Sequence, residues 1–265
     1  GVGKTTMSVN ISDCLARRHN VRVLLIDIDP QFNATQCLMS GDEYIKHLQD
    51  EKDTILTIFE RQNRTTVSTV NGISQSSSKS LEDIENIRIK DNFDLLPGNL
   101  ELYRVEMTPG EGRENRLNKY IRELERQNLY DYVLIDTPPT PSVWMTSALL
   151  ASNYYLIPVK PDPISFTGID LLQSIIQNKK ENFDLQIECA GIVLTMIEEG
   201  TLVYREALQQ LGKGKWKDYK FNKALPKRTV IARTQTNKGF ILDLQDDVSK
   251  ISLSGIVNEL IKRVQ

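Results

Sequence analysis

The first six residues, Gly-Val-Gly-Lys-Thr-Thr, have the types and spacing of the second half of a phosphate-binding loop. In such a loop, small glycines let backbone N–H groups close around the phosphates of a nucleotide. Lys4 is predicted to reach the β- and γ-phosphates, and Thr5 to offer its hydroxyl group to Mg²⁺. The pattern therefore predicts nucleotide contacts from the whole loop: Gly1, Val2, Gly3, Lys4, Thr5 and Thr6.

The complete G-x-x-x-x-G-K-[ST] motif requires residues ahead of Gly1, as does the hydrophobic strand that normally leads into it. We therefore expect that the chain lacks its natural N-terminus and the first strand of its sheet. Because that strand is central, we expect this polypeptide to fold poorly and bind ATP weakly beside a version extended by the missing segment.

Two further segments end in acidic residues where buried strands are expected to finish. The run VRVLLIDIDP ends in Asp27 and Asp29, and the i, i+2 spacing puts both carboxylates on one side of an extended chain. The run YVLID ends in Asp136 and is followed by Thr-Pro-Pro. Because open α/β sheets bind ligands at the carboxyl ends of their strands, these carboxylates are candidates for Mg²⁺ coordination, directly or through water.

Each acidic residue also has a purely structural interpretation. Asp27 and Asp29 could cap the following helix or open a turn before Pro30, and Asp136 could serve the turn at Thr-Pro-Pro. The occurrence of all three after a phosphate-binding loop favours a nucleotide–Mg²⁺ site.

The elements that must position these residues alternate between short apolar runs and helical patterns. This alternation predicts βαβ units and an α/β fold of the P-loop NTPase type. We expect a doubly wound, mostly parallel sheet with helices on both faces, and Ser142 as the N-cap of one helix. Strands are predicted over residues 21–28, 93–96, 132–135, 154–159 and 190–196, and helices over 5–19, 113–127, 144–152, 167–179, 203–211 and 244–264.

The composition is ordinary for a soluble protein, with 40% hydrophobic and 26% charged residues in a chain of 265. A net charge of −2 means that any contact with nucleic acid must be local. The three cysteines, Cys14, Cys37 and Cys189, are too widely separated to suggest a zinc site or a disulfide framework. We expect a single P-loop ATPase domain over residues 1–265, with a flexible serine-rich loop at residues 68–80.

The motifs resemble those of the ParA-type partition ATPases, the deviant-Walker ATPases of the Soj/MinD superfamily that segregate plasmids and chromosomes. The resemblance covers nearly the whole chain. Its DxDPQxNAT string at residues 27–35 is far more specific to the family than a generic phosphate-binding loop. The segments that carry it are GVGKTT, LLIDIDPQFNAT, YDYVLIDTPP, LIPVKPD and GIVLTM.

The resemblance implies a cytoplasmic ATPase that forms a homodimer around two ATP molecules with Mg²⁺. The ATP-bound dimer would bind DNA without sequence preference and associate with the nucleoid, and a ParB-type centromere-binding partner would stimulate hydrolysis. Because no arginine in cis is evident beside the phosphates, turnover is expected to be slow without that partner. Stable membrane association is not expected.

Residue roles follow from the same resemblance. The catalytic residues are Lys4, Asp29 and Asp136. Lys4 contacts phosphate, Asp29 positions or activates the attacking water, and Asp136 is the Walker-B acid. Thr5, Asp27 and Asp136 hold or support Mg²⁺.

Adenine and ribose contacts are expected near Thr195 and Pro226.

The chain departs from the family pattern in two places. The family's first loop lysine, which reaches the nucleotide of the partner subunit, would precede Gly1. The stretch 42–91 is also fuller than the compact family version, which leaves its local structure open.

Three alternatives stay open. A MinD-type membrane-associated ATPase switch would need an amphipathic C-terminal helix beyond the core, whereas the apolar stripe over residues 251–264 suits docking on the sheet. A reductase relative with an Fe–S cluster would need paired cysteines, which the spacing does not provide. An inactive truncated fragment is the third.

The segment 213–238 carries nine cationic residues against one acidic residue, Asp218, in an otherwise acidic chain. Trp216, Tyr219 and Phe221 are interleaved with them. This cation density predicts contact with a phosphate backbone, although a solvated loop beside an edge strand would look similar. The DNA-binding candidates are Lys223, Lys227, Arg228 and Arg233.

Overall fold

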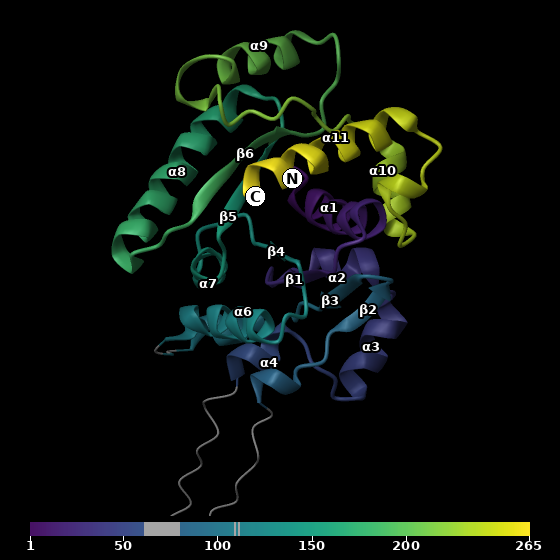
Figure 1. Cartoon of the computed structure of the whole chain (residues 1–265), viewed down its shortest axis with the longest axis vertical. Helices are drawn as coiled ribbons and strands as arrows, with labels where there is room; N and C mark the ends of the chain where they lie inside the picture. Colours follow the sequence, from purple (N-terminus) through teal and green to yellow (C-terminus); the bar gives the residue numbers. More distant parts are fainter. Residues whose placement is uncertain (61–79, 109, 111) are drawn as a thin grey trace, which may run out of the picture.

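The structure, a computed structural model, describes residues 1–60, 80–108, 110 and 112–265. The strands of this part of the chain form two sheets (Figure 1). The larger sheet has the order β2 (Ile87–Lys90), β3 (Phe93–Leu96), β1 (Val23–Asp27) and β4 (Tyr132–Asp136), and the smaller one joins β5 (Tyr154–Val159) to β6 (Glu188–Leu194). All pairings are parallel except that of β2 with β3.

Strand β1 shows why the chain forms a buried sheet at this point. All five of its residues are buried, and successive side chains enter opposite layers of the core. Val23 and Leu25 belong to one hydrophobic cluster, whereas Leu24 and Ile26 belong to another. A run that is apolar at every position therefore needs cover on both faces.

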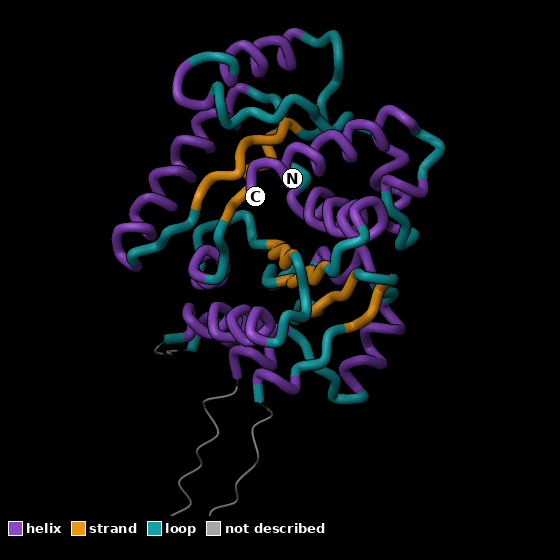
Figure 2. The backbone as a smooth tube through the Cα atoms, in the orientation of Figure 1, coloured by secondary structure: helices purple, strands orange, loops and turns teal. Residues whose placement is uncertain are grey.

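Helices supply that cover on each side of the sheets (Figure 2). One cluster packs the first face against α1 (Lys4–His19), α2 (Asn33–Leu38), α10 (Thr229–Thr236) and α11 (Asp247–Val264). On the opposite face, α4 (Ile55–Glu60), α5 (Leu102–Met107), α6 (Arg116–Arg126) and α7 (Val143–Leu150) cover the larger sheet. The smaller sheet packs against α8 (Pro163–Phe183) and α9 (Leu202–Leu211), and α3 (Gly41–Gln49) follows α2.

The fold class predicted from the sequence is confirmed: parallel strands carry helices on both faces. Strand β4 pairs only with β1, and β5 only with β6, among the described residues. A single domain and a strand ahead of Gly1 stay predictions. The serine-rich loop at 68–80 lies outside the described residues except for Ser80, whose side chain caps a short 3₁₀ turn.

Most predicted elements have their counterparts, with shifts at the ends. The helix predicted over 113–127 is a 3₁₀ turn, Arg113–Asn115, followed by α6. Ser142 is the N-cap of α7, as expected, and accepts a hydrogen bond from the Met145 N–H.

The apolar stripe of α11 docks on the core, since Leu253, Ile256 and Val257 are buried in the cluster that covers the first face. This agrees with the docking expected from the sequence and leaves that stripe within the fold. Among the described residues, no helix combines the length and the apolar character that crossing a membrane requires.

Candidate nucleotide-binding site

The phosphate-binding loop leads directly into α1, which packs against one face of the larger sheet. Gly3 is the N-cap of this helix and has a left-handed backbone with φ 80°, which glycine adopts without the strain that a side chain would bring. No side chain caps the first N–H groups, and no acidic residue lies in the first turn. The helix N-terminus therefore presents free donors and the positive end of its dipole to an anion.

Two hydroxyl groups of α1 hold the carboxylate of Asp136. Thr5 donates to Oδ2 at 2.8 Å, and Ser8 donates to Oδ1 at 2.9 Å. Thr5 and Asp136 were both predicted as site residues, but Ser8 was not. The signal for Ser8 is its i, i+3 spacing from Thr5, which places both hydroxyls on one face of the helix.

Asp27 and Asp136 end the neighbouring strands β1 and β4 and are paired in register. Asp27 is fully buried, and its Oδ2 accepts hydrogen bonds from the Thr35 backbone N–H and the Thr35 hydroxyl, each at 2.8 Å. The parallel register thus brings together two carboxyl groups that are more than a hundred positions apart in the chain.

Burial governs the protonation of this pair. Burial, and to a smaller extent the neighbouring Asp136 carboxylate, raises the pKa of Asp27 to about 8. Burial likewise raises the pKa of Asp136 to about 6, against the lowering effect of the Thr5 and Ser8 hydrogen bonds. Two buried carboxylates with raised pKa values indicate a place where a cation would be stabilised.

Asp29 lies just beyond β1 and is also buried. Its Oδ1 accepts the Gln31 N–H at 2.9 Å, and its own N–H donates to Asp27 Oδ1 at 3.3 Å. The structural interpretation of these two acids is therefore partly realised, because each stabilises the local turn. Both remain beside Asp136 at the carboxyl end of the sheet.

The predicted base-contacting residues lie near the loop to different degrees. Thr195 donates from its hydroxyl group to the Val2 carbonyl at 2.7 Å, which brings the end of β6 against the phosphate-binding loop. Pro226 forms an isolated bridge with Ile197 and is therefore one step further along the same edge. Gly1 is exposed at the start of the chain.

Thr6 makes a contact that the sequence did not predict. Its hydroxyl group donates to Oε1 of Gln235 on α10 at 3.0 Å. Gln235 is only 8% exposed, and its amide nitrogen lacks a hydrogen-bond partner among the described residues. The last residue of the loop is thus joined directly to the helix within the basic segment.

The donor set suits Mg²⁺. The Thr5 hydroxyl and the Asp136 carboxylate are hard oxygen donors 2.8 Å apart. Burial disfavours the charged form of both carboxyl groups of the strand pair, and a bound cation would offset that effect. Mg²⁺ usually keeps waters and phosphate oxygens and takes only one or two protein ligands. The described residues hold no cluster of three or more His, Cys, Asp or Glu side chains suited to a metal by themselves.

The basic segment lies apart from this carboxylate cluster. Lys227 pairs with Glu198 at 2.6 Å and Arg228 with Asp246 at 3.4 Å. Lys223 and Arg233 are exposed and have no ion-pair partner within the part of the chain that the structure describes. The four predicted DNA-binding residues therefore divide into two paired and two unpaired cations.

The three aromatic residues interleaved with these cations differ in their exposure. Trp216 and Phe221 are buried and belong to hydrophobic clusters, so their rings are not presented to a ligand. Tyr219 is 40% exposed and is the aromatic residue of the three that reaches solvent. The sequence pattern could not separate aromatic rings that complete the core from rings on the surface.

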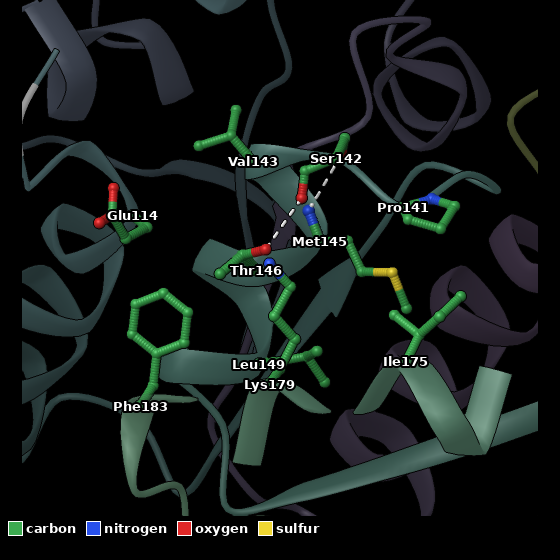
Figure 3. Close-up of a pocket in the computed structure, with 10 residues that line it drawn as sticks. All are labelled: Glu114, Pro141, Ser142, Val143, Met145, Thr146, Leu149, Ile175, Lys179 and Phe183. Carbon is green, nitrogen blue, oxygen red and sulfur yellow. Dashed lines mark hydrogen bonds between the residues drawn. The ribbon is translucent and has the colours of Figure 1, made fainter. Parts of the chain in front are cut away.

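A cavity of about 360 Å³ lies elsewhere, between α7 and α8 (Figure 3). It begins at the N-cap of α7 but includes neither the phosphate-binding loop nor the strand-end carboxylates, so we do not place the nucleotide there. Its lining is mostly apolar and comprises Glu114, Pro141, Ser142, Val143, Met145, Thr146, Leu149, Ile175, Lys179 and Phe183.

The site has the features of a P-loop nucleotide-binding protein. A glycine precedes the first helix, and a lysine and a threonine begin that helix. Carboxylates lie at the carboxyl ends of neighbouring strands in a mostly parallel sheet. Comparisons with known proteins agree. A family model described as an AAA domain matches residues 1–189. The chain is 30% identical to the sporulation initiation inhibitor protein Soj of Bacillus subtilis, over 89% of its own length and 84% of Soj.

A second relative is the chromosome partitioning protein ParA of Myxococcus xanthus, with 27% identity over 88% of this chain and 74% of that protein. The fold is shared with a solved structure of a putative plasmid partition protein from Borrelia burgdorferi B31 bound to AMPPNP. That match has a TM-score of 0.77 at 23% identity and covers 99% of this chain and 95% of the other. The chain belongs to the AAA domain family and, within it, to the ParA-type ATPases.

Proposed function

We propose that this protein is a DNA-partitioning ATPase that hydrolyses ATP to ADP and phosphate. The observation that carries the proposal is the hydrogen bond from Thr5 at the start of α1 to Asp136, in register with Asp27. It joins the phosphate-binding loop to the strand-end carboxylates. The relatives named for chromosome and plasmid partition support the same role for this protein.

The chemistry follows from the positions of the side chains. The Lys4 ammonium group neutralises negative charge that develops on the phosphates, and the α1 N–H groups bind their oxygens. Asp29 orients the attacking water by accepting its hydrogen bond. Thr5 and Asp136, supported by Asp27, are the residues that would hold Mg²⁺, which when bound supplies further neutralisation of the phosphate charge.

The finer features of the cycle are part of the same proposal. ATP binding produces a homodimer, the dimer binds DNA without sequence preference, and a ParB-type protein accelerates a slow basal hydrolysis. Such a protein would act in the cytoplasm on the nucleoid. The adenine and ribose are assigned to the edge formed by Thr195 and Pro226, because Thr195 already contacts the loop.

Isothermal titration calorimetry with ATP and Mg²⁺, paired with a phosphate-release assay, tests the proposal. We expect Lys4→Ala to abolish ATP binding, and Asp29→Ala to keep binding but lose hydrolysis by at least about 100-fold. Lys119→Ala, at an exposed position on α6, is the matched control and should change neither. Absence of ATP binding by the unaltered protein would refute the proposal.

A further inference from the structure

Phe32 has a backbone conformation that its residue type does not favour. It lies in the left-handed region, with φ 40° and ψ 42°, immediately before α2. A bulky non-glycine residue in this region is an outlier, and such outliers persist only where the surrounding structure enforces them. Phe32 is also the N-cap of α2 without a side-chain bond to the helix, so capping does not explain it.

An aromatic contact and a close backbone approach enclose the Phe32 side chain. Its ring stacks on that of Tyr44 from α3, with centroids 5.2 Å apart and an interplanar angle of 19°. The Tyr44 hydroxyl group donates to the Gly98 carbonyl at 2.9 Å. A Cβ on Gly98 would lie 2.6 Å from the Phe32 Cβ, so only glycine fits there without a shift.

The same contacts lead to the acidic residues of the site. The Gly98 N–H donates to the Thr35 hydroxyl at 2.8 Å, and that hydroxyl group in turn donates to Asp27. On the other side, the Phe32 N–H donates to the Asp29 carbonyl at 2.8 Å and closes the turn that carries Asp29. Phe32 therefore connects the Tyr44 ring to the turn of Asp29, the residue assigned to the attacking water.

We propose that Tyr44 is a positioning residue for ATP hydrolysis: its ring holds Phe32 in the left-handed conformation and so fixes the Asp29 turn. The inference rests on the proposed function, in which Asp29 orients the attacking water. A displacement of about 1 Å at such a residue can reduce a rate about 100-fold without weakening binding. The Tyr44 hydroxyl group also ties α3 to the Gly98 carbonyl, and burial raises the pKa of this group to about 12.

Substitution of Tyr44 should affect turnover and leave affinity intact. For Tyr44→Leu we expect the kcat for ATP hydrolysis to fall at least about tenfold, with the Kd for ATP and Mg²⁺ within about twofold of the unaltered protein. Tyr44→Phe keeps the stacked ring and should retain most of the kcat. Tyr103→Leu, an exposed tyrosine on α5, is the matched control and should change neither constant.

A double substitution separates positioning from general support of the fold. Glycine takes the left-handed conformation unaided, so Phe32→Gly should make Tyr44→Leu much less harmful to kcat in the double variant. Hydrogen exchange of the nucleotide-free protein gives a readout independent of activity. The Phe32 amide, bonded to the Asp29 carbonyl, should exchange faster in Tyr44→Leu than in Tyr44→Phe.

The outcomes are distinct. Hydrolysis by the unaltered protein with an unchanged kcat in Tyr44→Leu overturns the inference and leaves the proposed function standing. An equal loss of ATP affinity and kcat in Tyr44→Leu, or strictly additive effects in the double variant, also overturns it. If the unaltered protein binds no ATP, the proposed function fails and this inference fails with it.

Discussion

Asp27 and Asp136 are two buried carboxyl groups at the ends of adjacent strands. Their hydrogen bonds come from hydroxyl and backbone N–H groups. The Lys4 ammonium group lowers the pKa of Asp136 less than the Thr5 and Ser8 hydrogen bonds do. The metal-free site therefore carries an electrostatic penalty that bound cation and nucleotide would relieve.

This penalty predicts the pH dependence of stability. The folded-state pKa values, about 8 for Asp27 and about 6 for Asp136, lie above the ordinary value of 3.8. Between these limits the folded state binds more protons than the unfolded state, so the free energy of unfolding falls as pH rises from about 4 to about 8. We expect thermal melting of the metal-free protein at a lower temperature at the upper limit, and a flatter profile in Asp27→Asn.

Two comparisons complete this pH experiment. Asp218→Asn, at an exposed position, should keep the unaltered slope. Addition of ATP with Mg²⁺ should restore most of the stability at the alkaline end, because the cation favours the charged carboxylates. A slope in Asp27→Asn equal to that of the unaltered protein would contradict the assignment.

Ser8 provides a second prediction at the scale of single residues. Removal of its hydroxyl group takes away one of the two bonds that favour the charged form of Asp136. We expect Ser8→Ala to weaken ATP–Mg²⁺ binding by roughly three- to tenfold, in line with the net contribution of one typical hydrogen bond. Ser12→Ala, which removes only a bond to the Ser8 carbonyl within α1, should leave the affinity unchanged in calorimetry.

At the scale of elements, α1 joins the nucleotide site to the C-terminal third of the chain. Thr6 bonds to Gln235 on α10, and Asn10 bonds in two directions. The Asn10 amide nitrogen donates to the Thr6 carbonyl at 2.8 Å, and its oxygen accepts the Ile241 N–H at 2.7 Å. Because Asn10 is fully buried, these bonds have no competition from water.

Asn10→Leu should therefore destabilise the protein. The substitution leaves the buried Ile241 N–H without its acceptor, which costs about 1–3 kcal/mol of the free energy of unfolding. Asn258→Leu is the same exchange at an exposed position of α11 and should cost far less. Urea denaturation of both variants measures the difference, and equal midpoints would show that the Asn10 bonds do not stabilise the fold.

The elements that could be predicted are those whose burial is recorded in their own residues. Strands β3 and β5 have the predicted bounds because each is a short, mostly apolar run. Helices α2 and α10 were missed since they are short, and their stability comes from contacts with α1 and its surroundings. Strand β2 was missed because its Arg and Lys suit an edge strand, which carries little apolar signal.

The site divides in the same way. The strand-end acids and the loop were predicted because their spacing is local and their chemistry is specific. Ser8, Gln235 and the Tyr44–Phe32 contact depend on distances between elements, which a single sequence does not encode in any short pattern. The paired state of Lys227 and Arg228 belongs to the same category.

At the scale of the whole molecule, charge is distributed unevenly. The chain has a net charge of −2, yet it concentrates cations in residues 213–238. Ion pairs at the surface are worth little, so Lys227 and Arg228 can exchange their partners for phosphates at small cost. Lys223 and Arg233 have no such partners among the described residues and are expected to contribute more to DNA binding.

This arrangement predicts how DNA binding will depend on salt. We expect Lys223→Glu with Arg233→Glu to weaken duplex binding by the ATP-loaded protein at low salt. The slope of log K against log salt should become shallower by about 2, because each lost phosphate contact removes about 0.9. ATP affinity should be unchanged, since neither side chain contacts the loop or the strand-end carboxylates. Fluorescence anisotropy over a salt series measures both affinity and slope.

The matched control tests whether position or total charge is responsible. Lys119→Glu changes the net charge by the same amount per residue at an exposed site on α6, on the opposite face of the sheet from α10. If DNA responded to the net charge alone, two reversals on α6, with Lys119→Glu and Arg122→Glu, would reproduce the loss. We expect the slope to stay unaltered in that pair, because counterions are released only where cations meet phosphates. An equal change of the salt slope in both double variants would show that the basic segment is not the DNA-binding surface. That result would not bear on the nucleotide site.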